Sequence, residues 1–310
     1  MGKPVTAALA HSLLALLAAL PIVAAARGSE AAASKAVLVT GASTGIGRKI
    51  TERLAADGYF VYAGARKEAD LQALAAIKNV QPLRLDVTKQ QDIDAALSTV
   101  TKAGRGLYGL VNNAGIVTIG SVTETKMDEF DAVMAVNVYG PWRMTRAFAP
   151  LIIASKGRID NIGSINGIFV PPQSGAYSMS KHAIEAFTDA LAEELAPLGV
   201  QVSVVEPGSY KSDIFKNEVR RSGTGGQLAE LVSRARDPDE VASAVEQALF
   251  DRSPKRRYMV VPNEQQAEVT IKTQIERLVQ LNEGQPYAYD RDALVKMLDE
   301  ALAKSRPRTH

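Results

Sequence analysis

VLVTGASTGIGRKI, residues 37–50, joins a short apolar run to a helical pattern through a turn that contains Gly41, Gly45 and Gly47. Glycines permit a tight turn and a close approach of ligand to backbone, while the free N–H groups at the helix start face an anion. The turn is not a P-loop, because no Gly-Lys-Ser/Thr closes it. A strand, a glycine-rich turn and a helix in this order predict a dinucleotide phosphate site.

Strand and helix patterns alternate along most of the chain around this segment. Apolar runs predict strands near residues 36–40, 59–64, 80–86, 107–113, 157–164, 200–208 and 257–262. Helical patterns separate them, including a long helical region at about 126–155. The absence of hairpin turn signals indicates a parallel sheet covered on both faces. We therefore expect a single doubly wound α/β domain of about seven strands, with its ligand at the carboxyl ends of the strands.

An apolar segment precedes this domain, which we place at residues 35–262. The run LLALLAALPIVAAA, residues 13–26, follows a positive start and ends in small residues, as secretory signals do. Counted from Val5, the segment is long enough for an uncleaved membrane anchor. A helix packed on the domain is the third alternative. Residues 1–34 are therefore set apart, and both export and a membrane-associated location facing the cytoplasm stay open.

A helical extension, residues 263–310, follows the domain. Apolar residues recur there at helical spacing and predict two amphipathic helices. These residues are Ile271, Ile275 and Leu278 in the first helix and Leu294, Met297, Leu298 and Leu302 in the second.

Composition removes several classes of function. The 310 residues include no cysteine and three histidines, which excludes disulfides, thiolate nucleophiles and Cys-ligated zinc, and no metal site is expected. The net charge of +2 gives no reason to expect a nucleic-acid partner.

The end of the second strand bears on which dinucleotide is bound. An NAD site usually carries an acidic residue about 20 positions beyond the glycines, where it holds the ribose hydroxyls. Here Ala65 stands at that place and Arg66 follows. An arginine can bind a 2′-phosphate through paired hydrogen bonds, which favours NADP(H). NAD(H) is the alternative, because a solvated arginine would leave the site less selective.

SGAYSMSKHAIEAF, residues 174–187, places Tyr177 and Lys181 four residues apart, so that they share one face of a helix. Ile184 and Phe187 continue the helical spacing, and Gly199 lies near the expected end. A buried helix without chemistry would show the same pattern. The pair alone does not decide between packing and proton transfer.

Several motifs in the same order resemble the short-chain dehydrogenase/reductase family of single-domain Rossmann oxidoreductases, over about residues 36–262. TGASTGIG resembles the family's cofactor turn, LDVT its adenine contact, VNNAG its fourth-strand motif and EPGSYKSD the turn beside the nicotinamide. The resemblance implies a cofactor-binding set of Gly41, Ser43, Thr44, Gly45, Ile46, Gly47, Arg66, Asp86, Val87, Asn113, Ala114, Gly115, Tyr177, Lys181, Pro207, Gly208 and Ser212.

The resemblance also implies a catalytic set of Asn137, Ser164, Tyr177 and Lys181. Tyr177 would be the general acid/base, and to work in both directions its pKa would have to fall by roughly 2–3 units, favoured by the Lys181 ammonium and the nicotinamide. Lys181 would bind the nicotinamide ribose, Ser164 would polarise the substrate oxygen, and Asn137 would continue the proton relay through water.

The implied function is NADP(H)-dependent hydride transfer between a carbonyl and an alcohol. A catalytically silent NADP(H) sensor and an NAD(H)-dependent alcohol dehydrogenase are the alternatives. A sugar-nucleotide epimerase of the extended branch fits less well, because the chain has neither a Gly-x-x-Gly-x-x-Gly turn nor a larger C-terminal substrate domain.

FVYAGARK, PGSYKSDIF and PKRRYMVVP are similar to the hydroxysteroid and retinol dehydrogenase branch, which implies a hydrophobic alcohol or carbonyl substrate. The apolar wall of its pocket is expected from Ile165, Ile168, Phe169, Val170 and Pro171. Residues 210–228 are expected to form a basic lid that carries Lys211, Lys216, Arg220 and Arg221. Members of the family commonly form homodimers or homotetramers, and the same is expected here.

Three residues depart from the family pattern. Thr44 stands where many NADP-preferring relatives carry a basic residue, and Ser212 replaces a more frequent threonine but keeps the hydroxyl. Asp160 falls in a strand that should be buried on both faces, where a carboxylate costs several kcal/mol unless it is paired or protonated. A polar partner not visible in the sequence, or a position nearer the strand end, would explain it.

Overall fold

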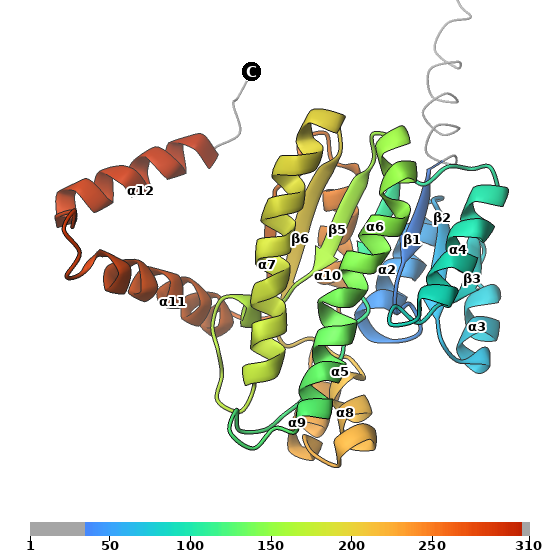
Figure 1. Ribbon diagram of the computed structural model, residues 1–310, viewed down its shortest axis with the longest axis horizontal. Coiled ribbons are helices and arrows are strands. Elements are labelled where there is room, and N and C mark those ends of the chain that lie inside the picture. The colour runs from blue at the N-terminus through green and yellow to red at the C-terminus, as the bar shows by residue number, and fades with distance from the viewer. Residues whose placement is uncertain (1–34, 306–310) are drawn as a thin grey trace, which may run out of the picture.

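One parallel sheet of seven strands forms the centre of the protein, whose computed structural model describes residues 35–305 (Figure 1). The strands run in the order β3-β2-β1-β4-β5-β6-β7. Their bounds are β1 (Ala36–Val39), β2 (Phe60–Ala65), β3 (Val80–Arg84), β4 (Gly109–Asn112), β5 (Arg158–Ile162), β6 (Gln201–Pro207) and β7 (Arg257–Val260). The predicted doubly wound α/β fold is confirmed. The predicted signal or anchor segment lies outside the described residues.

Helices cover both faces of the sheet. On one face lie α2 (Gly45–Ala56), α3 (Glu68–Ala75) and α10 (Asp239–Phe250), which pack against β1, β2 and β4. On the other face lie α4 (Gln90–Lys102), α6 (Tyr139–Ala154) and α7 (Gly175–Leu195). Burial on both sides explains why the strands read as continuous apolar runs. The strand order reverses between β1 and β4, which opens a crevice at their carboxyl ends.

The long helical region predicted at residues 126–155 is two helices, α5 (Met127–Asn137) and α6. The break falls at Val138, where the backbone has φ −113° and ψ −57°. Pro141 explains the break, because its nitrogen carries no hydrogen for the carbonyl of Asn137 four residues earlier. The Asn137 carbonyl is therefore left without its usual intrahelical partner.

The segment predicted as a lid contains two helices, α8 (Ile214–Ser222) and α9 (Gly226–Ser233), which lie below the carboxyl end of the sheet in Figure 1. The fully buried carboxylate of Glu218 fixes α8 to the loop after β4. It accepts a 2.9 Å hydrogen bond from Thr118 Oγ1 and pairs with Arg221. The buried carboxylate of Glu218 thus holds the lid against the loop after β4 through hydrogen bonds and an ion pair.

The C-terminal extension is an arm of two helices, α11 (Glu264–Asn282) and α12 (Arg291–Ser305), that projects from the sheet domain (Figure 1). Both terminal helices predicted from the sequence are present. Their apolar side chains stay exposed, Ile275 by 56% and Leu298 by 58%, so the arm does not bury its apolar face on the domain. Within residues 35–305, none of the helices combines the length and apolar character needed to cross a membrane.

Asp160 lies in the middle of β5, between Val111 of β4 and Ser203 of β6. Its side chain is 0% exposed, and neither carboxylate oxygen has a hydrogen-bond partner among the described residues. Both explanations offered from the sequence are therefore wrong. Burial raises the pKa of Asp160 well above its ordinary value, so the carboxyl is neutral and avoids the cost of a buried charge.

Substitution of Asp160 by asparagine should change how stability depends on pH. The native protein keeps a proton that the unfolded chain releases above the ordinary carboxyl pKa. Wild-type stability therefore falls by about 1.4 kcal/mol per pH unit from there up to the raised native pKa. Asp160→Asn lacks this proton and should gain stability relative to wild type over the pH range between the ordinary carboxyl pKa and the raised native pKa. Urea unfolding across this range measures the difference, and a difference independent of pH would contradict a protonated Asp160.

Candidate active site

The glycine-rich turn connects the carboxyl end of β1 to α2. Gly41 and Gly45 adopt φ values of 65° and 56°, in the left-handed region that glycine tolerates best. A Cβ at Gly47 would lie 2.3 Å from the carbonyl oxygen of Gly41, so this position admits no side chain. The first N–H groups of α2 have no partner within the helix. Together these features form a cradle that fits the pyrophosphate of a dinucleotide.

The end of β4 braces this turn. Thr40 Oγ1 accepts hydrogen bonds from the N–H groups of Asn113 and Ala114, each at 3.0 Å. Asn113 Nδ2 donates in return to the carbonyls of Thr40 at 2.8 Å and Gly41 at 3.1 Å. The side chain of Asn113 is thus engaged in shaping the turn, although the residue also lines the site.

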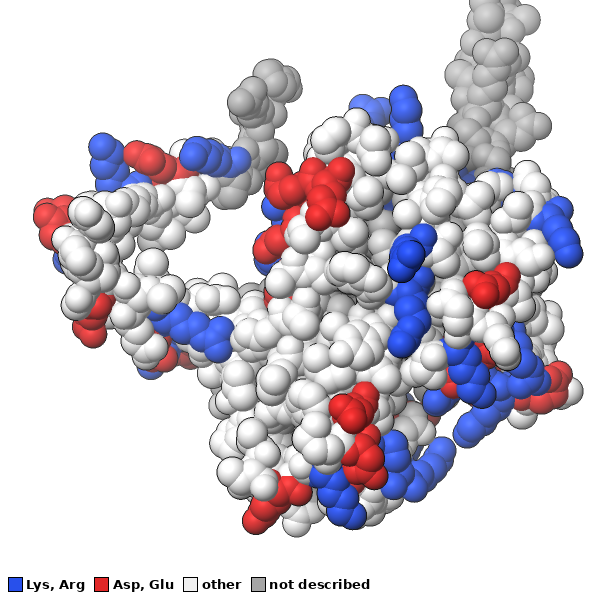
Figure 2. Space-filling view, in the orientation of Figure 1, with Lys and Arg blue, Asp and Glu red and all other residues white. Residues whose placement is uncertain are grey.

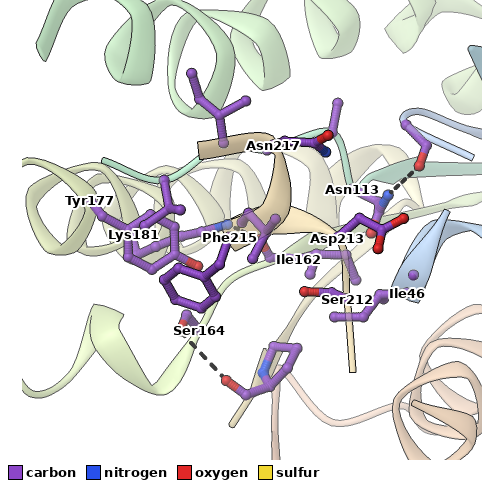
Figure 3. A pocket seen from close by; sticks show the side chains of 18 of the residues that line it. Ile46, Asn113, Ile162, Ser164, Tyr177, Lys181, Ser212, Asp213, Phe215 and Asn217 are labelled. Atoms are coloured by element: carbon purple, nitrogen blue, oxygen red, sulfur yellow. Dashed lines mark hydrogen bonds between the residues drawn. The ribbon is translucent and has the colours of Figure 1, made fainter. Parts of the chain in front are cut away.

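One cavity of about 510 Å³ extends from the turn to Tyr177. It is lined by every member of the predicted cofactor-binding set and by three of the four predicted catalytic residues, Ser164, Tyr177 and Lys181. Asn137 is the exception. In Figure 3 these three lie at one end of the cavity and Asn113 lies towards the other. Residues from distant motifs therefore line a single elongated site.

Tyr177 and Lys181 face this site from the first turns of α7. Lys181 Nζ donates a 2.8 Å hydrogen bond to the carbonyl of Ile162 at the end of β5, and lies 5.7 Å from the centroid of the Tyr177 ring. Ser164 follows β5, and its Oγ accepts a 3.1 Å hydrogen bond from the N–H of Asn166. Two hydroxyls and one ammonium thus meet where a reacting oxygen would lie.

The protonation of Tyr177 differs from the prediction made from the sequence. Burial raises the pKa of Tyr177 to about 12, and a hydrogen bond with Ser164 lowers it only in part. Burial also lowers the pKa of Lys181 to about 8, although the charge of Glu185 raises it. In the protein alone, the expected lowering of the tyrosine pKa is absent, because desolvation outweighs the hydrogen bond with Ser164. Tyr177 therefore holds its proton at neutral pH.

Asn137 acts from outside the cavity. Its Nδ2 donates to the carbonyl of Ile116 and to Ser180 Oγ, and its Oδ1 accepts from the N–H of Ile116, all at 2.9 Å. A Cβ built on Gly115 would lie 3.6 Å from Asn137 Oδ1 and 3.9 Å from Lys181 Nζ, so the two groups flank Gly115. Asn137 therefore fixes the loop after β4 next to the lysine.

Gln266 and Phe215, which lie outside the predicted cofactor-binding and catalytic sets, also line the cavity. Gln266 comes from α11 in the C-terminal extension, and its Oε1 accepts a 2.9 Å hydrogen bond from the N–H of Ser209. Phe215 comes from α8 and lies at the same end as Tyr177 in Figure 3. The positions of both residues depend on how α8 and α11 pack against the crevice, which the local spacing of residues in the sequence does not predict.

The predicted apolar wall is wrong at two of its five positions. Ile165, Phe169 and Pro171 line the cavity, whereas Ile168 and Val170 do not, and Val170 is 51% exposed. Further apolar side chains come instead from the loop after β4 and from the lid, namely Ile116, Val117, Ile119, Ile214, Phe215, Leu228 and Val232.

A cluster of carboxylates next to Lys181 was not predicted from the sequence. Glu185 lies one helical turn beyond Lys181 on α7, and Glu206 is buried in β6. The guanidinium of Arg257 lies 3.1 Å from Glu185 and 3.7 Å from Glu206. Burial, together with the neighbouring Glu185, raises the pKa of Glu206 to about 8. Glu206 therefore keeps its proton at neutral pH, and the lysine end of the site avoids a second full negative charge.

Known proteins resemble this chain in sequence. Residues 35–223 match the family model described as short chain dehydrogenase. The mitochondrial D-beta-hydroxybutyrate dehydrogenase of Rattus norvegicus is 38% identical over 192 residues, which cover 59% of this chain and 56% of that protein. Retinol dehydrogenase 5 of Mus musculus is 33% identical, over 75% of this chain and 82% of that protein. The chain thus spans little more than half the length of the hydroxybutyrate dehydrogenase.

Two solved structures resemble the fold. A short chain dehydrogenase/reductase from Burkholderia phymatum in complex with NAD has a TM-score of 0.71 at 25% identity, covering 82% of this chain and 98% of that chain. The closed form of a serine dehydrogenase complexed with NADP+ has a TM-score of 0.67 at 27% identity, covering 73% and 94%. These neighbours bind one or the other nicotinamide dinucleotide and do not distinguish between them for this chain.

Replacement of Gly47 by alanine should weaken dinucleotide binding while the domain still folds. The added Cβ would meet the Gly41 carbonyl oxygen and Asn113 Nδ2 at 2.3 Å, so the turn would have to open. We expect the NADPH affinity measured by calorimetry to fall by more than about tenfold. Gly226→Ala is the control, because no atom lies within 4 Å of a Cβ built there. Unchanged affinity in Gly47→Ala would show that the turn does not hold the phosphates.

Proposed function

Because the chain belongs to the short chain dehydrogenase family, we propose that it is an NADP(H)-dependent oxidoreductase that interconverts a carbonyl and an alcohol. The observation that carries this proposal is the cavity that joins the glycine-rich turn to Ser164, Tyr177 and Lys181. The turn fits a pyrophosphate, and the three polar side chains fit a reacting oxygen at the far end. A bound nicotinamide dinucleotide would supply or accept the hydride, while side chains of the protein would donate or accept the proton.

Tyr177 is suited to protonate a substrate oxygen. With its pKa raised to about 12, the phenol is fully protonated at neutral pH. As a carbonyl carbon is reduced, its oxygen gains negative charge and becomes basic enough to take the phenolic proton. The hydroxyl of Ser164 would donate a hydrogen bond to the same oxygen and hold it near Tyr177. In the protein alone, the protonated state of Tyr177 thus favours proton donation to a carbonyl oxygen, which is the reductive direction.

Lys181 and Asn137 would return the proton to Tyr177. Lys181 uses one of its three donors on Ile162, which leaves two for the nicotinamide ribose and the tyrosine oxygen. With its pKa lowered to about 8, the lysine can release and regain a proton near neutral pH. The Asn137 carbonyl, left free opposite Pro141, would hold a water that connects Lys181 to solvent.

The end of β2 supports a preference for NADP(H). Ala65 is the last residue of this strand, so no acid stands there to hold two ribose hydroxyls. Glu68 is the acid next in the chain, but Arg84 pairs with it at 2.8 Å. Arg66 lines the cavity and forms no ion pair with any described residue. Its guanidinium therefore stays available for a 2′-phosphate.

The cavity also supports a hydrophobic carbonyl or alcohol as substrate. Around Tyr177, the aromatic rings of Phe169 and Phe215 and the aliphatic side chains of Ile119 and Leu228 line the walls. Apolar walls bind apolar ligands through the surface that both remove from water. The name of the similar mouse retinol dehydrogenase 5 points to a substrate of the same kind.

Tyr177→Phe tests the proposed mechanism. Loss of the proton donor should lower kcat, followed by NADPH absorbance over a panel of hydrophobic carbonyls, by about 10²–10⁴-fold. NADPH affinity should change by less than about twofold, because the phenyl ring keeps its packing. Tyr139→Phe is the matched control, since Tyr139 is 53% exposed on α6 and does not line the cavity. Turnover at the wild-type rate in Tyr177→Phe would refute the general-acid role.

Arg66→Ala tests the cofactor preference. We expect NADPH affinity to fall by at least about tenfold and NADH affinity to change by less than about twofold, because only the 2′-phosphate loses a charged partner. Calorimetric titration with each nucleotide measures both affinities. Arg84→Ala is a useful comparison, because it removes a cation whose side chain is paired with Glu68. Equal losses for the two nucleotides would argue against a 2′-phosphate contact.

A further inference from the structure

A second cavity, of about 600 Å³, adjoins the candidate active site and takes no part in the mechanism above. It lies between the end of β2, α5 and α8, and it shares Arg66 and Asp86 with the first cavity. Four basic residues line it, namely Arg66, Lys67, Arg220 and Arg221. Basic side chains gather at the lower right of the molecule in Figure 2. Such a cavity attracts an anion.

One of these four cations is neutralised within the lid. Arg221 pairs with the fully buried Glu218 and also donates a 2.8 Å hydrogen bond to the carbonyl of Val117. Arg66, Lys67 and Arg220 form no ion pair within the described part of the chain. Three basic groups at this cavity are therefore not paired with a carboxylate within ion-pair distance in the described part of the chain.

Arg220 differs from the other basic residues predicted for the lid. Lys211 and Lys216 each pair with a carboxylate, at 3.6 Å and 3.0 Å. The guanidinium of Arg220 makes only a 3.5 Å contact with Asn217 Oδ1 from its own helix. Of the four lid cations, Arg220 alone has no described carboxylate within ion-pair distance.

The second cavity, which both Arg66 and Arg220 line, suits an anion with several oxygens. Two guanidiniums at one cavity repel each other unless negative charge lies between them. Asp86 supplies one negative charge, but its Oδ1 already accepts hydrogen bonds from the N–H and Oγ1 of Thr88, at 3.0 Å and 2.7 Å. A phosphate monoester carries close to two negative charges and three acceptor oxygens, enough to bind both guanidiniums.

We propose that Arg220 and Arg66 together bind the 2′-phosphate of NADP(H), so that this phosphate joins α8 to the end of β2. The proposal rests on the NADP(H) preference proposed above and adds a specificity-determining residue from the lid. Helix α8 also carries Phe215, which lines the first cavity near Tyr177. Binding of the 2′-phosphate therefore holds part of the substrate wall in place.

Nucleotide binding to the full chain tests this without turnover. Calorimetry gives the Kd of 2′,5′-ADP and of 5′-ADP for wild type, Arg220→Ala and Lys216→Ala. Arg220→Ala should weaken 2′,5′-ADP by about tenfold, as expected for one lost charge-assisted hydrogen bond, and 5′-ADP by less than about twofold. Lys216→Ala removes the same charge from the same helix and should spare both nucleotides. In wild type, amide hydrogen exchange across α8 should slow more with 2′,5′-ADP than with 5′-ADP.

The other outcomes separate the competing explanations. If Arg220→Ala and Lys216→Ala weaken the binding of 2′,5′-ADP equally, the loss of any positive charge on α8 weakens binding, and the proposal is overturned. 3′,5′-ADP, which carries the phosphates of coenzyme A, tests a phosphate brought by the substrate. If Arg220→Ala weakens it and spares 2′,5′-ADP, the proposal fails. If Arg66→Ala weakens 2′,5′-ADP and Arg220→Ala does not, only the role of Arg220 fails. If neither weakens it, the NADP(H) preference fails as well.

Discussion

The contact between the turn after β1 and the end of β4 fixes the position of the glycine-rich turn relative to the rest of the crevice. Thr40 and Asn113 exchange hydrogen bonds there, and Asn113 also reaches the carbonyl of Gly41. These bonds satisfy backbone groups at the point where the strand order reverses, which would otherwise be buried without partners. The opposite wall is set against this braced turn, since a Cβ on Gly45 would lie 3.1 Å from the Cβ of Ser212. A small shift in the brace would therefore change the width of the whole crevice.

At the other end of the crevice, burial keeps polar groups neutral. A parallel sheet covered on both faces gives its strands no water, so a carboxyl in them must be protonated or paired. Asp160 is protonated for this reason, and Glu206 keeps its proton at neutral pH. The same desolvation raises the pKa of Tyr177, which keeps it protonated, and lowers the pKa of Lys181. The packing that stabilises the fold thus also sets which of these groups are charged.

The sheet and the glycine-rich turn could be predicted from the sequence because their signals are local. Seven apolar runs separated by helical patterns suffice for the strands, and three glycines between strand and helix suffice for the turn. Pro141 carried the signal for the break between α5 and α6, but helical patterns on both sides concealed it. Gln266 could not be predicted, because its place depends on where a C-terminal helix returns to the domain. The pKa of Tyr177 depends on burial, which a spacing of four residues does not encode.

Formal charge in the lid overstates its attraction for acidic ligands. Four basic residues between β6 and α9 make the lid basic when they are counted from the sequence. In the folded chain three of them, Lys211, Lys216 and Arg221, are paired with carboxylates, so little long-range field remains. The remaining cation, Arg220, lines the cavity that holds Arg66 and not the apolar wall near Tyr177. The basic lid and the apolar wall are therefore compatible, because the unpaired cation lies at the end of the crevice that carries Arg66 and the apolar surface lies at the end that carries Tyr177.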